Sequence, residues 1–137
     1  MSIGGLAQHL ATLPGWMGDT LLLDGYDVAS APKNPEPESV AQIVAKLDEN
    51  VKKAKSAMAQ LDDAKAMGEW KLSMAGKTLI ALPRIGLLRS ILLNHSCHHR
   101  GQLTVYLRLL DVPVPSLYGP SADENPFAAR ATAAAAR

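Results

Sequence analysis

Three of the four histidines of this chain lie within five residues, in the run NHSCHHR at positions 94–100. The surrounding segment is strongly helical in pattern, and residues four apart lie on the same face of a helix. His95 and His99 therefore present two imidazoles to one point, which is the arrangement of a metal clamp. The remaining histidine, His9, lies in a second helical segment with apolar neighbours. If the two helices pack together, three imidazoles can hold one divalent ion.

Helical periodicity places the paired histidines on the inward stripe of their helix. A polar group buried on such a stripe costs about 1–3 kcal/mol unless it has a partner. Metal ligation with supporting hydrogen bonds provides partners, and the alternative is a metal-free network satisfied by protein and water. We interpret His98, at the edge of the stripe, as a structural residue, and the alternatives are that it orients a ligand or acts as an acid or base. We expect Gln102 or Tyr106 to contact the ligands or a substrate, although Tyr106 is equally well explained as a core aromatic. The stripe comprises Leu88, Leu92, His95, His99, Gln102, Tyr106 and Leu109.

The sequence predicts three helices, over residues 2–23, 39–61 and 83–110. Ser2 and Ser39 are suitable N-caps, and Pro83 suits the first turn of the last helix. Pro14 predicts a kink in the first helix. The second helix has an apolar stripe and a charged face that we interpret as exposed to solvent. The stripe is Val40, Val44, Leu47, Val51, Ala54, Met58 and Leu61, and the charged face is Lys46, Asp48, Glu49, Lys52, Lys53 and Lys55.

The connections between these helices mark the organisation of the chain. Segment 24–37 is rich in proline and predicts an extended crossover, whereas segment 66–82 predicts either short strands or an extended loop. The length of 137 residues corresponds to one domain. We therefore expect an all-α, metal-binding helical bundle domain over 1–124 and an alanine-rich, flexible tail over 125–137.

Composition excludes several classes of partner and location. The net charge of +1 gives no support to nucleic acid or an anionic membrane as a partner. No apolar run approaches the roughly 20 residues that span a bilayer, and the N-terminus lacks the pattern of a secretion signal. Cys97 is the single cysteine, which excludes an internal disulfide and fits a reducing compartment. We interpret Cys97 as a packing residue and expect a cytoplasmic protein.

Several of these segments resemble the DinB family. The stretch 94–106, with the following LRLLDVPVP and YGPSADE sequences, resembles its C-terminal half. The sequence LAQHLATLPGW at 6–16 resembles the segment with its first metal-binding histidine, and the Pro-Arg pair at 83–84 matches as well. The resemblance implies a DinB/YfiT-like up-down four-helix bundle with one divalent ion held by His9, His95 and His99. Imidazole accepts zinc, nickel, iron and manganese, so these ligands do not identify the metal.

Members of the DinB family usually have a further helix ahead of the segment that corresponds to residues 2–23. We expect this helix to be absent from the chain, which would leave one side of the bundle open. One explanation is a gene start that was assigned too far downstream. The other is a second copy of the chain that covers the exposed apolar face, and this explanation predicts a homodimer.

The three-histidine set predicts an open metal site, because structural zinc sites usually have four protein ligands. The open positions would accept water, a thiolate or a substrate oxygen. The resemblance implies a metal-dependent transferase or hydrolase for a small-molecule substrate, with a low-molecular-weight thiol as a cosubstrate. No catalytic nucleophile or general base can be assigned. The alternatives are a non-catalytic metal-binding stress protein, a truncated relative without activity, and a structural helical dimer without metal.

Overall fold

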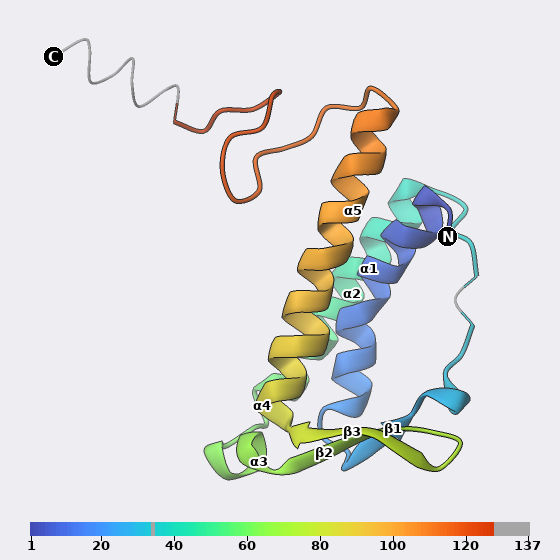
Figure 1. The fold of residues 1–137 in the computed structure, drawn as a ribbon, viewed down its shortest axis with the longest axis vertical. Coiled ribbons are helices and arrows are strands. Elements are labelled where there is room, and N and C mark those ends of the chain that lie inside the picture. The colour runs from blue at the N-terminus through green and yellow to red at the C-terminus, as the bar shows by residue number, and fades with distance from the viewer. Residues whose placement is uncertain (34, 128–137) are drawn as a thin grey trace, which may run out of the picture. The chain divides into compact units, whose positions relative to one another are not determined.

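The computed structural model describes residues 1–33 and 35–127. These residues belong to two compact units, Met1–Arg100 and Gly101–Arg137, and we describe each unit by itself. The described chain is mostly helical, as expected, but it also contains a three-stranded sheet, which corrects the all-α prediction (Figure 1). The helices of the first unit are α1 (Ile3–Thr20), α2 (Val40–Met58), α3 (Asp63–Met67) and α4 (Arg84–Leu87), and α5 (His95–Leu109) begins in it.

The sheet pairs a strand from the predicted crossover, segment 24–37, with two strands from segment 66–82. For the latter segment the sequence allowed either short strands or a loop. Its order is β1-β2-β3, with β1 parallel to β2 and β2 antiparallel to β3. The turn between β2 and β3 contains Ala75 and Gly76, both with positive φ. The Asp27 carboxylate accepts hydrogen bonds from the backbone N–H groups of Ala75 and Gly76, at 3.0 and 2.8 Å, which attaches β1 to this turn. The strands are β1 (Gly25–Asp27), β2 (Glu69–Met74) and β3 (Lys77–Pro83).

Each of the two long helices α1 and α2 starts at a side-chain cap that the sequence predicts. The Ser2 hydroxyl accepts a hydrogen bond from the N–H of Gly5 at 2.9 Å and caps α1, which contains Pro14. The Ser39 hydroxyl accepts one from the N–H of Gln42 at 3.2 Å and caps α2. These two predicted helix starts are therefore confirmed.

Helices α1 and α2 pack closely and run in the same direction. Gly4 faces Pro37 near their N-terminal ends, and Gly18 faces Lys53 further along both helices. Parallel neighbours differ from the predicted up-down order. The physical reason is the connection between them, which passes through β1 and returns to the starting end before α2 begins.

Only part of the predicted apolar stripe of α2 is buried. Val40, Val44 and Leu47 are exposed, whereas Ala54 of the stripe is buried, and Met58 and Leu61 pack against the core. The closest approach lies at Gly15 and Gly18, where little room remains for large side chains. Close packing therefore selects small residues over the most apolar ones. The buried residues of α2 are Asn50, Ala54 and Ala57.

Replacing Gly15 by alanine is expected to destabilise the protein by about 2–3 kcal/mol, because the added methyl group would overlap the Asn50 side chain. Asn50 is buried, and its amide donates a 2.8 Å hydrogen bond to the Ala11 carbonyl, so it cannot move aside without losing that bond. Gly101→Ala is a matched control in another helix, where an added methyl group meets nothing within 4 Å. The control should be neutral or stabilising in urea denaturation, and equal destabilisation by both variants would contradict the packing argument.

The core of the first unit lies between α1, the sheet and the start of the last helix. Met17 and Leu21 of α1 pack with Trp70 of β2 and with Leu87 and Leu88. Trp70 is fully buried, and its indole N–H donates a hydrogen bond to the Thr20 carbonyl at 3.1 Å. The sheet is thus fixed to the end of α1. This attachment also holds the earlier residues of α1 in place.

The last helical segment begins after Pro83, as predicted, but it is not a uniform α-helix. Arg84–Leu87 is α-helical, and Leu88–Asn94 forms the π-helical segment η2. Such segments often occur at functional sites, because the wider turn rotates the residues that follow. Here the N–H of His95 ends the segment with hydrogen bonds to the Leu92 and Ser90 carbonyls. The π-helical segment therefore sets the direction in which the histidine pair projects.

The second unit contains the end of α5 and an irregular segment with internal hydrogen bonds. Arg108 and Asp123 form a 2.6 Å ion pair, and the Asp123 carboxylate also accepts from the N–H of Val114 at 2.8 Å. The pKa of the Asp123 carboxyl is lowered, mainly by the hydrogen bond from Arg108. Among the residues that the structure describes, no helix combines the length and apolar character needed to cross a membrane. The predicted tail over 125–137 lies outside the described residues from position 128 onward.

Candidate metal centre

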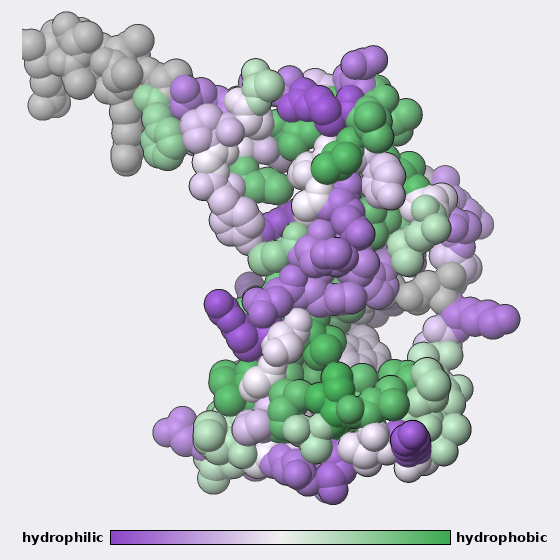
Figure 2. Space-filling model, viewed as in Figure 1, coloured by the Kyte–Doolittle hydropathy of each residue, from purple (hydrophilic) through white to green (hydrophobic). Residues whose placement is uncertain are grey.

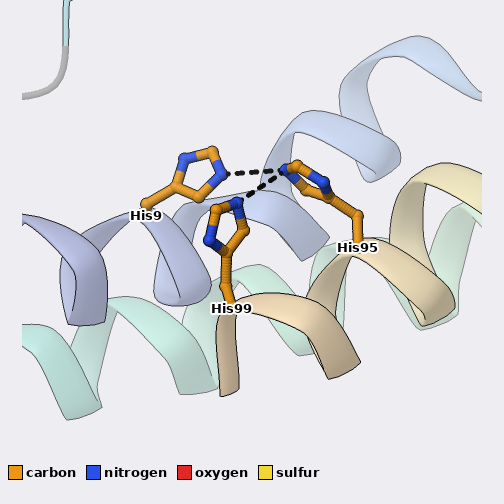
Figure 3. Close-up of side chains that lie close together, drawn as sticks. All are labelled: His9, His95 and His99. Atoms are coloured by element: carbon orange, nitrogen blue, oxygen red, sulfur yellow. Dashed lines mark hydrogen bonds between the residues drawn. The ribbon is translucent and has the colours of Figure 1, made fainter. Parts of the chain in front are cut away.

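The three predicted ligands converge in the first unit. His9 projects from α1, and His95 and His99 project from successive turns of α5, with their rings directed toward one another (Figure 3). The Nε2 atom of His95 lies 3.2 Å from Nε2 of His9 and 3.0 Å from Nε2 of His99. Two imidazole nitrogens at about 2.0–2.1 Å from one ion would be roughly 3.0–3.4 Å apart. The observed separations therefore match those of ligands that share an ion.

The hydrogen-bonding capacity of imidazole favours a cation in this cluster. Nε2 of His95 faces two other ring nitrogens, but a ring nitrogen has either one proton or one in-plane lone pair. It can therefore satisfy only one neighbour by a hydrogen bond. A divalent ion accepts all three lone pairs together, so the donor set fits a metal better than it fits a closed network of hydrogen bonds.

The electrostatic setting favours the neutral form of two of the three histidines. Burial lowers the pKa of His9, and the nearby His99 and His95 lower it further. Burial also lowers the pKa of His95, with additional effects from His99 and His98. Neutral imidazole is the form that binds metal, so these shifts favour ligation at neutral pH.

The lowered pKa values predict how stability depends on pH. Between the folded-state pKa values of His9 and His95 and the ordinary value of about 6.5, the unfolded chain binds more protons than the folded chain. The free energy of unfolding of the metal-free protein should therefore fall as pH decreases below about 6.5. Metal affinity should fall in the same range, because protons compete with the ion for both imidazoles.

Urea denaturation of the chelator-treated protein at a series of pH values measures this effect. The His9→Gln variant should show a smaller loss of stability below about pH 6.5, since one of the two titrating groups is removed. A metal-free protein that becomes more stable as pH decreases through this range would contradict the assignment of lowered pKa values.

The other residues near the histidine pair occupy different positions. His98 is exposed, and its ring centroid lies 4.9 Å from that of His99 and 6.4 Å from that of His95, outside the three-ligand group. Cys97 is exposed, which corrects its interpretation as a packing residue. Gln102 and Tyr106 are exposed residues of the second unit, and their predicted contact with the ligands or a substrate stays a prediction.

A cavity of about 510 Å³ opens beside the histidine cluster within the first unit. His9 and His95 line it, so a molecule in the cavity can reach the point on which the imidazoles converge. Its size is in the range of small-molecule sites. Other residues of its wall include Thr12, Trp16, Asp19, Tyr26, Lys46 and Lys53.

The part of this cavity that α2 contributes could not be recognised in the sequence. Lys46 and Lys53 are partly exposed, as the predicted charged face requires, but both also line the cavity, with Asn50 between them. Their spacing of four and three residues is the signal that places all three on one face of a helix. The signal was masked because the apolar stripe beside it appeared to be the inward face.

Two comparisons with known proteins gave matches. A 39-residue stretch is 46% identical to the uncharacterized protein YrdA of Bacillus subtilis strain 168, and the match covers 28% of this chain and 23% of that protein. The aligned part is thus less than a quarter of the relative's length. No solved structure matches the chain. Residues 1–129 match the sequence profile of the DinB family, a range that includes all three histidines. The chain belongs to the DinB family.

Proposed function

We propose that this protein is a metal-dependent transferase or hydrolase that acts on a small molecule in the cavity beside His9 and His95. The observation that carries the proposal is the shared position of these two histidines in the ligand cluster and in the cavity wall. A metal site with only a structural role needs no adjoining cavity of this size. The three-histidine donor set also leaves coordination positions free, as in catalytic sites.

The residues of the chain have defined tasks in such a reaction. His9, His95 and His99 would hold the ion, which would supply Lewis acidity that favours the anionic form of a thiol or of water. The cavity orients the electrophile toward that point and limits the access of bulk water. In a transfer reaction, a sulfur–carbon bond forms as the leaving group departs with its electron pair, and the thiol proton passes to solvent. With water in place of the thiol, the same arrangement gives hydrolysis.

A low-molecular-weight thiol is the cosubstrate that we propose. Incubation of the zinc- or nickel-loaded protein with glutathione or cysteine and 1-chloro-2,4-dinitrobenzene tests this chemistry through the absorbance of the conjugate. We expect conjugation above the uncatalysed rate only with the metal-loaded parent, and not after chelation or in the His95→Ala variant. Stoichiometric metal without turnover of any thiol or ester would favour the alternative of a non-catalytic metal-binding protein.

We also propose that the protein is a cytoplasmic homodimer. The support for a dimer is exposed apolar surface in the first unit, which Figure 2 shows over the region of the sheet and α4. Leu79 and Ile80 of β3 and Ile85 of α4 are each more than one third exposed. A second copy that covers such surface would remove it from water. Sedimentation at micromolar concentration tests the proposal, and a monomer of 14.6 kDa would contradict it.

A further inference from the structure

The walls of the 510 Å³ cavity differ in chemistry along its length. At one end lie His9 and His95, whose Nε2 atoms are 3.2 Å apart. Asn50 of α2 faces Gly15 of the parallel helix α1, so Lys46, one turn before Asn50, comes level with the turn of α1 that follows His9. Further along α1 comes Trp16, seven residues after His9, which corresponds to about 10 Å along a helix. The cavity therefore runs from a polar, metal-proximal end to an aromatic end.

The aromatic end is rigid. The Trp16 ring stands nearly perpendicular to the rings of Tyr26 and Trp70, with centroid distances of 5.5 and 6.1 Å. Trp70 is fully buried, so it fixes the indole from behind, while Trp16 is half-buried and lines the cavity. A wall of fixed aromatic rings favours a flat, apolar ligand, which loses little entropy on binding there.

The two lysines that line the cavity have carboxylate partners in different places. Lys53 pairs with Asp19 at 2.5 Å, and both residues line the cavity, so their charges offset each other. Lys46 pairs with Glu49 at 3.1 Å, but Glu49 does not line this cavity, and its side chain is 67% exposed. An exposed pair of this kind contributes less than about 1 kcal/mol, so an anion in the cavity can compete for the lysine.

We propose that the cavity selects an organic anion with a flat apolar body. Its anionic group lies near Lys46 at the histidine end, and its apolar body lies against Trp16 and Tyr26. This inference rests on the proposed function, since it names the substrate class of the same site. Two separate features carry it, the aromatic wall and the lysine whose carboxylate partner lies outside the cavity.

Two fluorescent probes separate these features. The probe 1-anilinonaphthalene-8-sulfonate has a flat aromatic body and an anionic group, and N-phenyl-1-naphthylamine has the same rings without the sulfonate. We expect the parent protein to bind the sulfonate probe about tenfold more tightly than the neutral probe, because one charge-assisted contact would give a difference of this size. Lys46→Gln should remove this preference and leave binding of the neutral probe unchanged. Lys52→Gln is the matched control, because Lys52 is an exposed lysine of the same helix that does not line the cavity.

The Trp16→Leu variant tests the aromatic wall and should lower the affinity for both probes by about tenfold. If this variant is not folded by circular dichroism, Tyr26→Leu tests the same wall. Equal binding of the two probes by the parent, or sulfonate binding that neither Lys46→Gln nor the aromatic variants alter, would overturn the inference. Titrations with and without added Zn²⁺ distinguish the two proposals, because the cavity can retain its selectivity when metal binding or turnover fails.

Discussion

Replacing His95 by alanine is expected to reduce the metal content of the purified protein by about tenfold or more, because His95 is the central ligand of the cluster. Its Nε2 atom is within 3.2 Å of both other ring nitrogens. Without this imidazole, His9 and His99 remain as two ligands from different helices. Elemental analysis of protein purified under identical conditions measures the loss.

His98→Ala is the matched control for this prediction. It removes a histidine from the same helix, three residues away, that lies outside the ligand group. Its metal content should stay close to that of the parent, and His9→Ala and His99→Ala should behave like His95→Ala. Equal metal content in His95→Ala and the parent would refute the assigned ligands.

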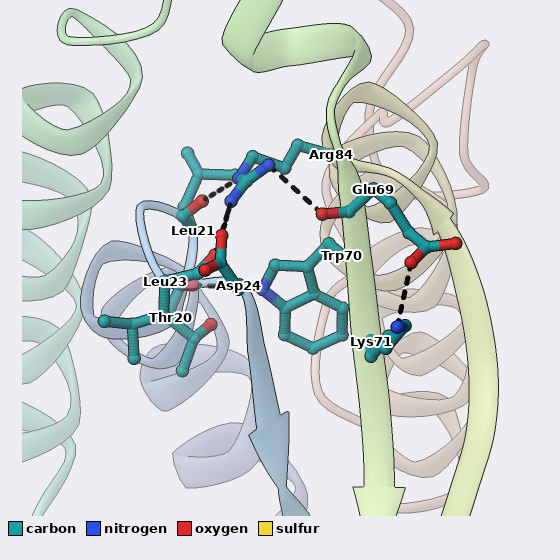
Figure 4. A network of polar contacts seen from close by, with 8 residues as sticks. All are labelled: Thr20, Leu21, Leu23, Asp24, Glu69, Trp70, Lys71 and Arg84. Atoms are coloured by element: carbon teal, nitrogen blue, oxygen red, sulfur yellow. Dashed lines mark hydrogen bonds and ion pairs between the residues drawn. The ribbon is translucent and has the colours of Figure 1, made fainter.

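Replacing Arg84 by alanine is expected to lower the free energy of unfolding by about 3 kcal/mol or more, because three backbone carbonyls lose their partner. Arg84 is buried and donates to the carbonyls of Leu21, Leu23 and Glu69 at 3.1, 2.9 and 3.2 Å (Figure 4). It thereby joins the end of α1 to β2. Urea denaturation monitored by tryptophan fluorescence measures the loss.

Two further variants show which contacts of Arg84 matter. Arg84→Lys should recover little stability, because one ammonium group cannot replace the three directions of the guanidinium. Asp24→Asn removes the 2.8 Å ion pair with Arg84, but the Asp24 side chain is fully exposed, so its loss should be much smaller than that of Arg84→Ala. A larger effect for Asp24→Asn than for Arg84→Ala would contradict this account.

The sequence predicted those parts of the fold that depend on local chemistry. The capping serines Ser2 and Ser39 begin α1 and α2 as expected, because each hydroxyl satisfies N–H groups of its own first turn. The i, i+4 pair of His95 and His99 depends only on helical geometry, and the predicted partner His9 completes the cluster. For these features a short stretch of chain contains all the necessary information.

Features that depend on contacts between distant segments could not be predicted in the same way. The strand β2 is defined by pairing with β1, more than forty residues earlier, so the sequence left segment 66–82 open between strand and loop. The inward face of α2 depends on close approach to Gly15 and Gly18 in α1. The role of Arg84 depends on carbonyls at the end of α1, and no local pattern signals it.

The π-helical segment also limits how well helical periodicity predicts the inward face of the last helix. A stripe counted at 3.6 residues per turn assumes an unbroken α-helix, but Leu88–Asn94 has a wider turn. His95 and His99 lie after this segment, in the regular helix α5, and keep the predicted face. The wider turn therefore affects the register of the residues before His95, and the predicted contacts of Gln102 and Tyr106 stay predictions.

X-ray absorption spectroscopy of the metal-loaded protein is the most direct test of the central claim, that three histidines hold one divalent ion at an open site. We expect one ion for each chain, with scattering from three imidazole nitrogens at about 2.0–2.2 Å and at least one non-protein oxygen or nitrogen ligand. A spectrum with two or fewer imidazoles, or with sulfur from Cys97 in the coordination sphere, would contradict the claim.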